Sequence, residues 1–384
     1  MERRQLLMTP GPTMVPARAL MAASEAMIHH RTTQYGEIFK KANKNLQEIF
    51  QTKNPVITFP SSGTGGLEAS TVNFFSPGDR VLCVSIGVFG DRVARIAEIF
   101  GLEVEKLSVE WGRGVDPEIV ADRLKSKDYK GIFITHNETS TGANNDLEAI
   151  GQLVKDKDTL LIVDAVSSLG GLDIQTDNWG LDVVVAASQK AIMSAPGLAF
   201  LSVSQKARRA AQASTMPKYY WDVLKALEAM EKPLPQNPYT PAVSLIKSTN
   251  VAMEMILQEG LDNVFNRHGR LASALQAGIE ALGLELFAEA EYRSNVVTSV
   301  LMPEGINGDD LRKIISDKYG VIIAGGQQRL KGKIIRIGHM GYVAEGDIIE
   351  TMAALERGLK IIGYPVEIGW GVKRVLQTLG IENT

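Results

Sequence analysis

Two charged side chains, Asp164 and Lys190, follow apolar runs of the kind that form buried strands. Asp164 ends the run at residues 160–163, and Lys190 comes three residues after the run at residues 183–187. Because parallel strands end at the same edge of a sheet, we expect the carboxylate and the ammonium at one site. Alone, Asp164 is better explained as a cap or as the partner of an arginine, and Lys190 could be a solvated surface lysine.

Together, in this order, the two residues favour a site for pyridoxal 5'-phosphate (PLP). This cofactor needs an amine that forms a Schiff base with its aldehyde, which Lys190 can supply. It also needs an acid that keeps its pyridine nitrogen protonated, so that the ring can accept electrons. Asp164 can supply that acid.

The segment from Ser61 to Gly66 (Ser-Ser-Gly-Thr-Gly-Gly) lies between a predicted strand and a predicted helix. Glycines permit a close approach of the backbone, and a helix N-terminus offers free N–H groups, so the segment could hold one phosphate group. A glycine-rich turn capped by serine explains the same residues about as well. No Gly-Lys-Ser/Thr follows, which excludes a Walker loop, and no GxGxxG dinucleotide fingerprint is present.

Three further positions could contact a ligand. Phe89 follows the predicted strand at residues 80–85, where its ring could stack on a flat cofactor or pack in the core. The polar segment 136–142 suits hydrogen bonding to the edge of a ligand, although a loop that leads to a helix cap explains it equally. Arg336 is a charge within an apolar strand, and a buried guanidinium needs an anion, either a ligand carboxylate or the partner in a structural salt bridge.

The composition is that of an ordinary soluble globular protein. The 384 residues are 45% hydrophobic and 22% charged, and the net charge of -3 gives no sign of nucleic acid or of an anionic membrane. The one cysteine, Cys83, lies in an apolar run, which excludes a disulfide framework or a cysteine zinc site within the chain. No metal-ligand spacing links the histidines, which are His29, His30, His136, His268 and His339. Without a signal-like or membrane-length apolar stretch, we expect the reducing cytoplasm.

Strands and helices alternate up to about residue 203, and the strands are nearly continuous apolar runs. This pattern predicts an α/β fold with a mostly parallel central sheet that helices cover on both faces. Ligands of such sheets bind beyond the carboxyl ends of the strands. The segments 61–66, 136–142 and 188–190 and the residue Asp164 all fall at that edge, so we expect them to meet in one crevice.

The pattern changes after about residue 241, where two long helices lead into a smaller α+β domain. We expect an N-terminal extended segment at residues 1–16, a large domain at residues 17–262 and a small C-terminal domain at residues 263–384. The tail at residues 365–384 has apolar residues at helical spacing and is expected to form a packing helix.

These motifs together resemble the class V aminotransferases of fold type I, especially the alanine–glyoxylate and serine–pyruvate or serine–glyoxylate group. The resemblance covers most of the chain, from residue 10 to the predicted helix that ends near residue 358. The matching segments are specific in their order and spacing. They are Gly11-Pro12-Thr13, Ser62-Gly63-Thr64, Glu138-Thr139-Ser140-Thr141-Gly142, Val163-Asp164-Ala165-Val166-Ser167-Ser168, Ser188-Gln189-Lys190 and Arg336-Ile337-Gly338.

The resemblance implies PLP as the cofactor and a role for each matching residue. Lys190 would hold PLP as a Schiff base and later carry the Cα proton, Asp164 would pair with the pyridine nitrogen, and Arg336 would bind the substrate carboxylate. The remaining implied contacts are Ser62, Gly63, Thr64 and Gln189 around the phosphate, Phe89 on the ring, Thr139 at the polar edge of the ring and at the substrate, and Gly11 at the substrate. Tyr239 and Thr240 fall where relatives reach across a homodimer interface to the partner's phosphate.

The implied activity is transamination of a small L-amino acid, serine or alanine, with pyruvate or glyoxylate, through pyridoxamine phosphate and with ping-pong kinetics. The sequence does not choose between the donors or between the acceptors. Three alternatives stay open. A 2-aminoethylphosphonate-type aminotransferase would need extra cations, for which Arg31 is the candidate. A cysteine desulfurase would need a mobile cysteine, and Cys83 is badly placed. A non-catalytic subunit could retain the fold, although Lys190, Asp164 and Arg336 argue against it.

Overall fold

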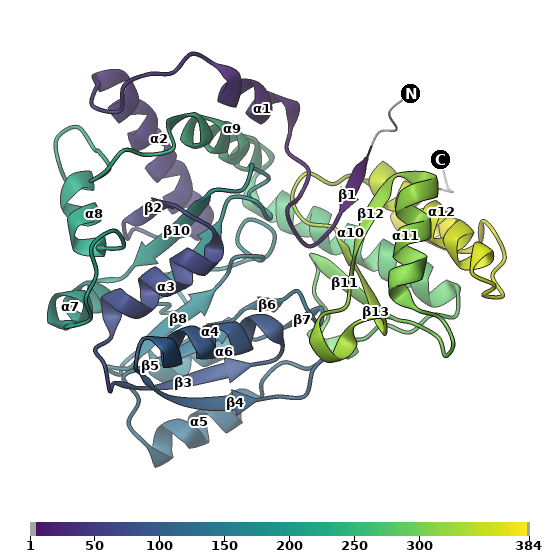
Figure 1. Cartoon of the computed structure of the whole chain (residues 1–384), viewed down its shortest axis with the longest axis horizontal. Helices are drawn as coiled ribbons and strands as arrows, with labels where there is room; N and C mark the ends of the chain where they lie inside the picture. Colours follow the sequence, from purple (N-terminus) through teal and green to yellow (C-terminus); the bar gives the residue numbers. More distant parts are fainter. Residues whose placement is uncertain (1–4, 382–384) are drawn as a thin grey trace.

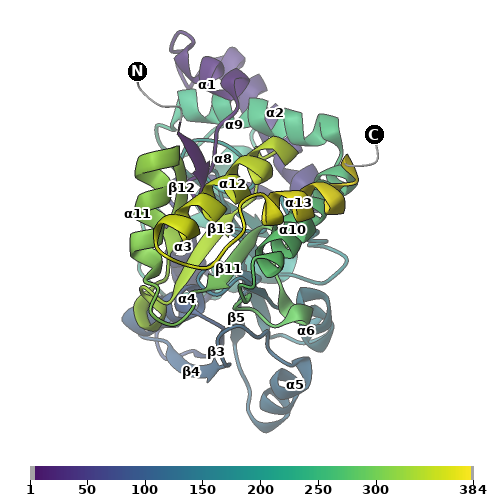
Figure 2. The same cartoon turned by 90° about the vertical axis from the view of Figure 1, so that its right-hand side faces the viewer.

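The protein is seen in a computed structural model that describes residues 5–381, and it has two unequal parts (Figure 1). The larger part holds a seven-stranded sheet with helices α1 to α9, and the smaller part holds a four-stranded sheet with helices α10 to α13. The turned view in Figure 2 shows the helices of the smaller part covering its sheet. None of the helices in the described residues is long and apolar enough to cross a membrane.

The large sheet has the strand order β2-β10-β9-β8-β5-β3-β4. Its strands are β2 Val56–Pro60, β3 Arg80–Ser85, β4 Glu103–Ser108, β5 Gly131–Thr135, β8 Leu160–Asp164, β9 Val183–Ala187 and β10 Leu198–Val203. The strands from β4 to β9 in this order are parallel neighbours, and β10 runs antiparallel to the strands on both of its sides. The predicted α/β fold with a mostly parallel sheet is therefore confirmed.

Alternate side chains of each strand point to opposite faces, so the large sheet supplies two cores. In β8, Leu161 and Val163 join the core under α2, α5, α6 and α9, whereas Leu160 and Ile162 join the core under α3, α4, α7 and α8. These helices are α2 Thr33–Phe50, α3 Gly63–Phe74, α4 Val88–Ile99, α5 Pro117–Ser126, α6 Leu147–Val154, α7 Gln205–Ala213, α8 Val223–Met230 and α9 Val243–Glu259, and α1 Ala17–Ser24 packs on α9. Because both faces are covered, polar side chains that carry chemistry are confined to the strand ends.

The small sheet has the order β1-β12-β13-β11, and its first strand comes from the start of the chain. Its elements are β1 Leu6–Met8, α10 Leu261–Ala281, β11 Val297–Leu301, α11 Gly308–Tyr319, β12 Val321–Gly325, β13 Ile334–Gly338, α12 Glu345–Ile361 and α13 Trp370–Leu379. β1 pairs in parallel with β12, which aligns Leu6 with Val321. The chain then passes between the two parts, where the Thr13 amide donates a hydrogen bond to the Gln189 carbonyl.

Some elements differ from the expectation. β4 was not predicted, because it is a half-exposed edge strand in which charged residues interrupt the apolar pattern. Phe89 was expected to follow the strand at residues 80–85, and it lies in the first turn of α4. The predicted packing helix of the tail is α13, whose Val375 and Leu379 are buried. Residues 1–4 of the expected N-terminal segment and residues 382–384 of the tail lie outside the described residues.

Candidate active site

A cavity of about 140 Å³ lies at the edge of the large sheet where β8 and β9 end. Residues from five separate segments line it, and four of these are the segments that the strand-end argument placed at one edge of the sheet. The predicted residues that line it are Ser62, Gly63, Thr64, Phe89, Thr139, Asp164, Gln189 and Lys190. Ser62 follows β2 and Lys190 follows β9, and only β10 lies between these two strands in the sheet. The sheet order thus brings residues that are far apart in sequence to one cavity.

Asp164 and Lys190 come to the cavity because β8 and β9 are parallel neighbours. Asp164 is 6% exposed, and its Oδ1 accepts a hydrogen bond of 3.0 Å from the Val166 amide. The Lys190 Nζ donates to the Pro10 carbonyl, and Gly11 lies so close to the lysine side chain that a Cβ at this position would overlap it. The N-terminal segment therefore passes directly over Lys190, which brings Gly11 beside the predicted site.

Burial shifts the pKa values of this acid and this base toward each other. Burial raises the pKa of Asp164 to about 6, against the opposing effects of the Val166 amide, Lys190 and Arg92. Burial lowers the pKa of Lys190 to about 8, against the opposing charge of Asp164 and with the help of Arg336 and Arg92. At neutral pH the pair is a carboxylate beside an amine that is close to its titration point, which suits a lysine that acts as nucleophile and base.

The first turn of α3 forms another wall of the cavity and suits a phosphate group. Ser62, the residue before the helix, makes no side-chain capping hydrogen bond, and the first amides of a helix have no partner within it. Gly63 packs against Val166 with no room for a Cβ. Gln189 lines the same cavity, and the Nε2 of its side-chain amide can donate a hydrogen bond to a phosphate oxygen. These residues fit the phosphate of PLP.

Glu138 ties the segment after β5 to the start of α4. The segment forms a small hairpin, β6 Asn137–Glu138 and β7 Ala143–Asn144, in which Glu138 is fully buried. Its carboxylate accepts hydrogen bonds from the amides of Phe89 (3.0 Å), Gly90 (3.1 Å) and Ser140 (3.1 Å) and from the Ser140 hydroxyl (2.6 Å). Burial raises the pKa of Glu138, but four donors favour the carboxylate form. Glu138 thereby fixes the position of Phe89.

Arg336 lies in the middle of β13 and is 7% exposed. Its Nε donates to the Gly325 carbonyl and its Nη1 to the Thr139 carbonyl, both at 2.8 Å. Burial lowers its pKa to about 10, against the effect of Glu138, so the guanidinium stays charged at neutral pH. Arg336 does not line the cavity itself but is bonded to Thr139, which does. Within the described residues it has no salt bridge, so donors remain free for a ligand carboxylate.

The comparisons with known proteins agree with this geometry. A profile of the family aminotransferase class-V matches residues 7–348. This chain belongs to the class V aminotransferases. The family implies PLP as the cofactor of this enzyme, and the residues around the cavity fit it.

Three relatives of this aminotransferase illustrate the range of names in the family. The chain is 42% identical to the soluble hydrogenase 42 kDa subunit of Anabaena cylindrica over 95% of both chains. It is 36% identical to the serine–glyoxylate aminotransferase of Hyphomicrobium methylovorum over 95% of this chain and 92% of the relative. The crystal structure of ureidoglycine–glyoxylate aminotransferase from Bacillus subtilis matches it with a TM-score of 0.95 and 32% identity over 99% of each chain.

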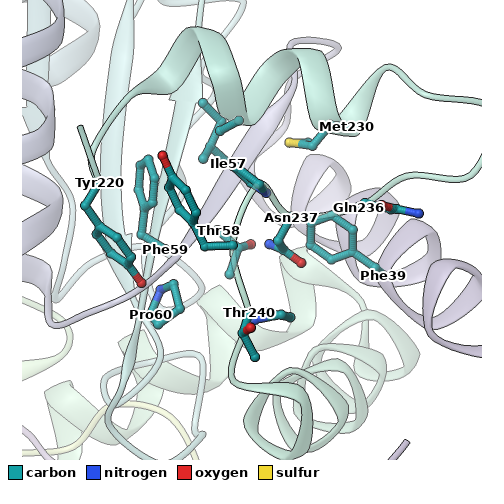
Figure 3. Close-up of a pocket in the computed structure, with 14 residues that line it drawn as sticks. Phe39, Ile57, Thr58, Phe59, Pro60, Tyr220, Met230, Gln236, Asn237 and Thr240 are labelled. Atoms are coloured by element: carbon teal, nitrogen blue, oxygen red, sulfur yellow. The ribbon is translucent and has the colours of Figure 1, made fainter. Parts of the chain in front are cut away.

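Two predicted residues of this aminotransferase, Tyr239 and Thr240, do not line the cavity. They border a second pocket between β2, α2 and the loop that follows α8. Figure 3 shows Thr240 in that pocket with Phe39 of α2 and Thr58 of β2. Within one chain, the structure therefore does not bring Tyr239 and Thr240 together with the other predicted residues.

Arg31 holds the loop that carries these two residues. Its Nη1 donates to the Gln236 Oε1 and to the Asn237 carbonyl, both at 2.8 Å, and its Nη2 donates to the Pro238 carbonyl at 3.2 Å. The guanidinium is thus engaged by loop oxygens and does not line the cavity. A residue that binds the phosphonate group of a substrate would have to line the cavity, and Arg31 does not.

Five residues line the cavity without having been predicted, namely Leu67, Arg92, Asn137, Val166 and Ser167. Leu67 and Arg92 each lie three residues after a predicted site residue on a helix, so the helical period could have found them. Val166 and Ser167 follow Asp164 in the same loop. Asn137 and Ser167 are joined by a 2.8 Å hydrogen bond between distant segments, which no local pattern reveals.

Proposed function

We propose that this aminotransferase moves an amino group from a small L-amino acid, serine or alanine, to a 2-oxo acid, pyruvate or glyoxylate, with ping-pong kinetics. The observation that carries the proposal is the pair Asp164 and Lys190 at the cavity, near the buried Arg336, which makes no salt bridge within residues 5–381. The name of the relative from Hyphomicrobium methylovorum supports serine and glyoxylate, and that of the Bacillus subtilis structure supports glyoxylate.

The proposal gives each residue around the cavity a role toward PLP. Lys190 anchors the cofactor, Asp164 keeps a proton on its pyridine nitrogen, and Phe89 covers one face of its ring. The remaining contacts are Ser62, Gly63, Thr64 and Gln189 at the phosphate and Thr139 at the polar edge of the ring. When it is bound, PLP supplies an electron sink for the electrons released at the Cα of the amino acid.

The side chains of the protein orient the amino acid and move its proton. Arg336 binds the α-carboxylate in a bidentate fashion, beside Gly11 and Thr139, which holds the Cα facing Lys190. With a pKa lowered to about 8, the Lys190 amine has a substantial neutral fraction at neutral pH, so it can take the Cα proton and return it. Asp164, with a pKa of about 6, stays negatively charged in this pH range.

We further infer a cytoplasmic homodimer in which Tyr239 and Thr240 reach the phosphate in the partner's cavity. The distance of these residues from the cavity of their own chain supports this arrangement, because they then have no other part in the site. In the proposed division of the chain, residues 17–262 bind PLP, residues 263–384 supply Arg336, and the segment 1–16 supplies Gly11.

The alternatives find little support in the same observations. Cys83 is buried in β3, where burial raises the pKa of its thiol to about 12, so it is unsuited to the nucleophilic role in a cysteine desulfurase. Arg31, the candidate cation for a phosphonate, is engaged by its loop and does not line the cavity. A relative is named as a hydrogenase subunit, but a non-catalytic subunit has no need of a pKa-shifted lysine beside an aspartate.

The test is the absorbance spectrum of the purified protein with PLP, recorded before and after L-serine or L-alanine is added. We expect one donor to remove the visible band of the bound cofactor, and pyruvate or glyoxylate to restore it. A band that neither donor changes would indicate another amine substrate. A protein that shows no band after PLP is added would contradict the role of Lys190 and favour the non-catalytic alternative.

A further inference from the structure

We infer that Arg92, to which neither the family motifs nor the relatives give a role, is a cofactor-binding residue that contacts the phosphate group of PLP. The inference rests on the proposed function, because it concerns the same cavity. It adds a charged contact to a phosphate site that otherwise consists of helix amides, a threonine and a glutamine.

The position of Arg92 places its guanidinium at the wall formed by α3. Arg92 lies on α4 three residues after Phe89, so both side chains leave the same face of the helix and line the cavity. Its Nη1 donates to the Thr64 Oγ1 at 3.4 Å, and its Cζ lies 4.6 Å from the centre of the Phe89 ring. Thr64 belongs to the first turn of α3, whose free amides face an anion in the proposed site.

Within residues 5–381, Arg92 makes no salt bridge, whereas Arg95, one turn further along α4, pairs with Glu98 at 3.0 Å. Arg92 is half-buried, and Asp164, the acidic residue that lines the same cavity, makes no salt bridge with it, so the guanidinium can pair with an anion that a ligand supplies. Arg92 also lowers the pKa of both Asp164 and Lys190, which shows that its charge is felt throughout the cavity.

A phosphate is the anion that fits these observations best. A phosphate group can accept hydrogen bonds from a guanidinium and from helix amides at the same time. The side chains of serine and alanine bring no charge, and the substrate carboxylate already has Arg336 on the other side of Thr139. We therefore assign the anion that Arg92 binds to the cofactor rather than to the amino acid.

The test compares the binding of PLP with that of pyridoxal, which lacks the phosphate, to the cofactor-free full-length protein. Both ligands are titrated by absorbance and by protein fluorescence against wild type, Arg92→Gln and Arg92→Lys. Arg95→Gln serves as the matched control, because it removes the same charge from an exposed position on the same helix. Circular dichroism and thermal unfolding without ligand establish that each variant is folded.

We expect Arg92→Gln to weaken PLP binding by about tenfold to a hundredfold, the usual effect of losing a charged hydrogen bond. Pyridoxal binding should change by no more than about twofold, Arg92→Lys should lose less than Arg92→Gln, and Arg95→Gln should match wild type. Equal losses of PLP and pyridoxal would overturn the inference, because Arg92 would then act on the ring through Phe89. Unchanged PLP binding with a raised KM for an acidic amino donor would also overturn it and assign Arg92 to the substrate. A wild-type protein that binds neither ligand would instead contradict the proposed function.

Discussion

Two segments of this aminotransferase were predicted to touch PLP, and they are built in opposite ways. Every residue of the segment 136–142 is buried, and Glu138 within it accepts four hydrogen bonds from groups of the same chain. The loop 236–241 is mostly half-buried or exposed. In it, Tyr239 stacks at the surface on Tyr219 and Tyr220, with ring centres 5.7 and 5.6 Å away.

The two segments differ in whether a single chain places their predicted ligand-binding residues at its own cavity. It does so for the segment 136–142 but not for the loop 236–241. The hairpin has its buried Glu138 carboxylate paired within the chain and holds Phe89 and Thr139 at the cavity wall, whereas the buried Asn137 Oδ1 has no hydrogen-bond partner in residues 5–381. The loop places Tyr239 and Thr240 outside the cavity of their own chain, although the Tyr239 hydroxyl donates a hydrogen bond to the Tyr219 carbonyl. Substitutions in the hairpin should therefore affect stability and activity together, and substitutions in the loop should affect cofactor binding alone.

The largest effect is expected from Lys190→Ala. This substitution removes the amine that is proposed to bind the cofactor that both segments were predicted to contact. Without the amine that anchors the cofactor and moves the Cα proton, transamination should fall by about a thousandfold or more. Steady-state rates with L-serine or L-alanine as donor measure this loss, and Lys373→Ala, an exposed lysine of α13, is the control. A variant that keeps a tenth of the activity would show that another residue anchors the cofactor and moves the Cα proton.

The next effect is expected from Glu138→Gln in the hairpin. The substitution places an amide NH2 among N–H and O–H donors, so we expect a loss of about 2 kcal/mol in the free energy of unfolding and at least a tenfold loss of kcat/KM. Urea unfolding of the cofactor-free protein and steady-state kinetics measure the two losses, with the exposed Glu148→Gln as the matched control. An unchanged stability would mean that the hairpin does not depend on the buried carboxylate.

Thr240→Val tests the open loop and should behave differently. If the hydroxyl reaches a phosphate in the partner's cavity, PLP affinity should fall by about tenfold while the free energy of unfolding without cofactor stays within about 0.5 kcal/mol. Titration with PLP measures the affinity, and Thr378→Val on α13 is the control. Mixing this variant with Lys190→Ala should restore part of the activity, because mixed dimers then contain one intact site. No recovery in proven mixed dimers would argue against a shared site.

The pH dependence of cofactor capture should be the smallest of these effects. Because the pKa of Lys190 is lowered to about 8, its neutral, nucleophilic fraction rises as pH increases through that value. The initial rate of PLP incorporation should therefore increase by about tenfold between pH 7 and pH 9. Because the pKa of Asp164 is raised to about 6, PLP affinity should weaken as pH falls below 6 and the acid becomes neutral. Stopped-flow absorbance measures both changes, and a flat rate would contradict the shifted lysine.

The sequence predicted those parts of the site whose residues directly follow a recognisable strand in the chain. Asp164, Lys190 and the first turn of α3 follow apolar strands, and parallel strands must end at one edge. The contacts that were missed join segments far apart in sequence. β1 pairs with β12, and Glu138 bonds the amides of α4, and no pattern of neighbouring residues encodes either contact. Arg92 was missed for another reason, because the residue one helical turn after Phe89 was not assigned a role.

The most direct test of the account is the yield of a single half-reaction. The PLP-loaded protein is mixed with L-alanine or L-serine without an acceptor, and the 2-oxo acid is quantified against bound cofactor. We predict one 2-oxo acid per bound cofactor for wild type and none for Lys190→Ala, with further 2-oxo acid formed from the donor only after pyruvate or glyoxylate is added as acceptor. Continuous release of product without an acceptor, or equal yields from wild type and Lys190→Ala, would contradict a transaminase that uses Lys190.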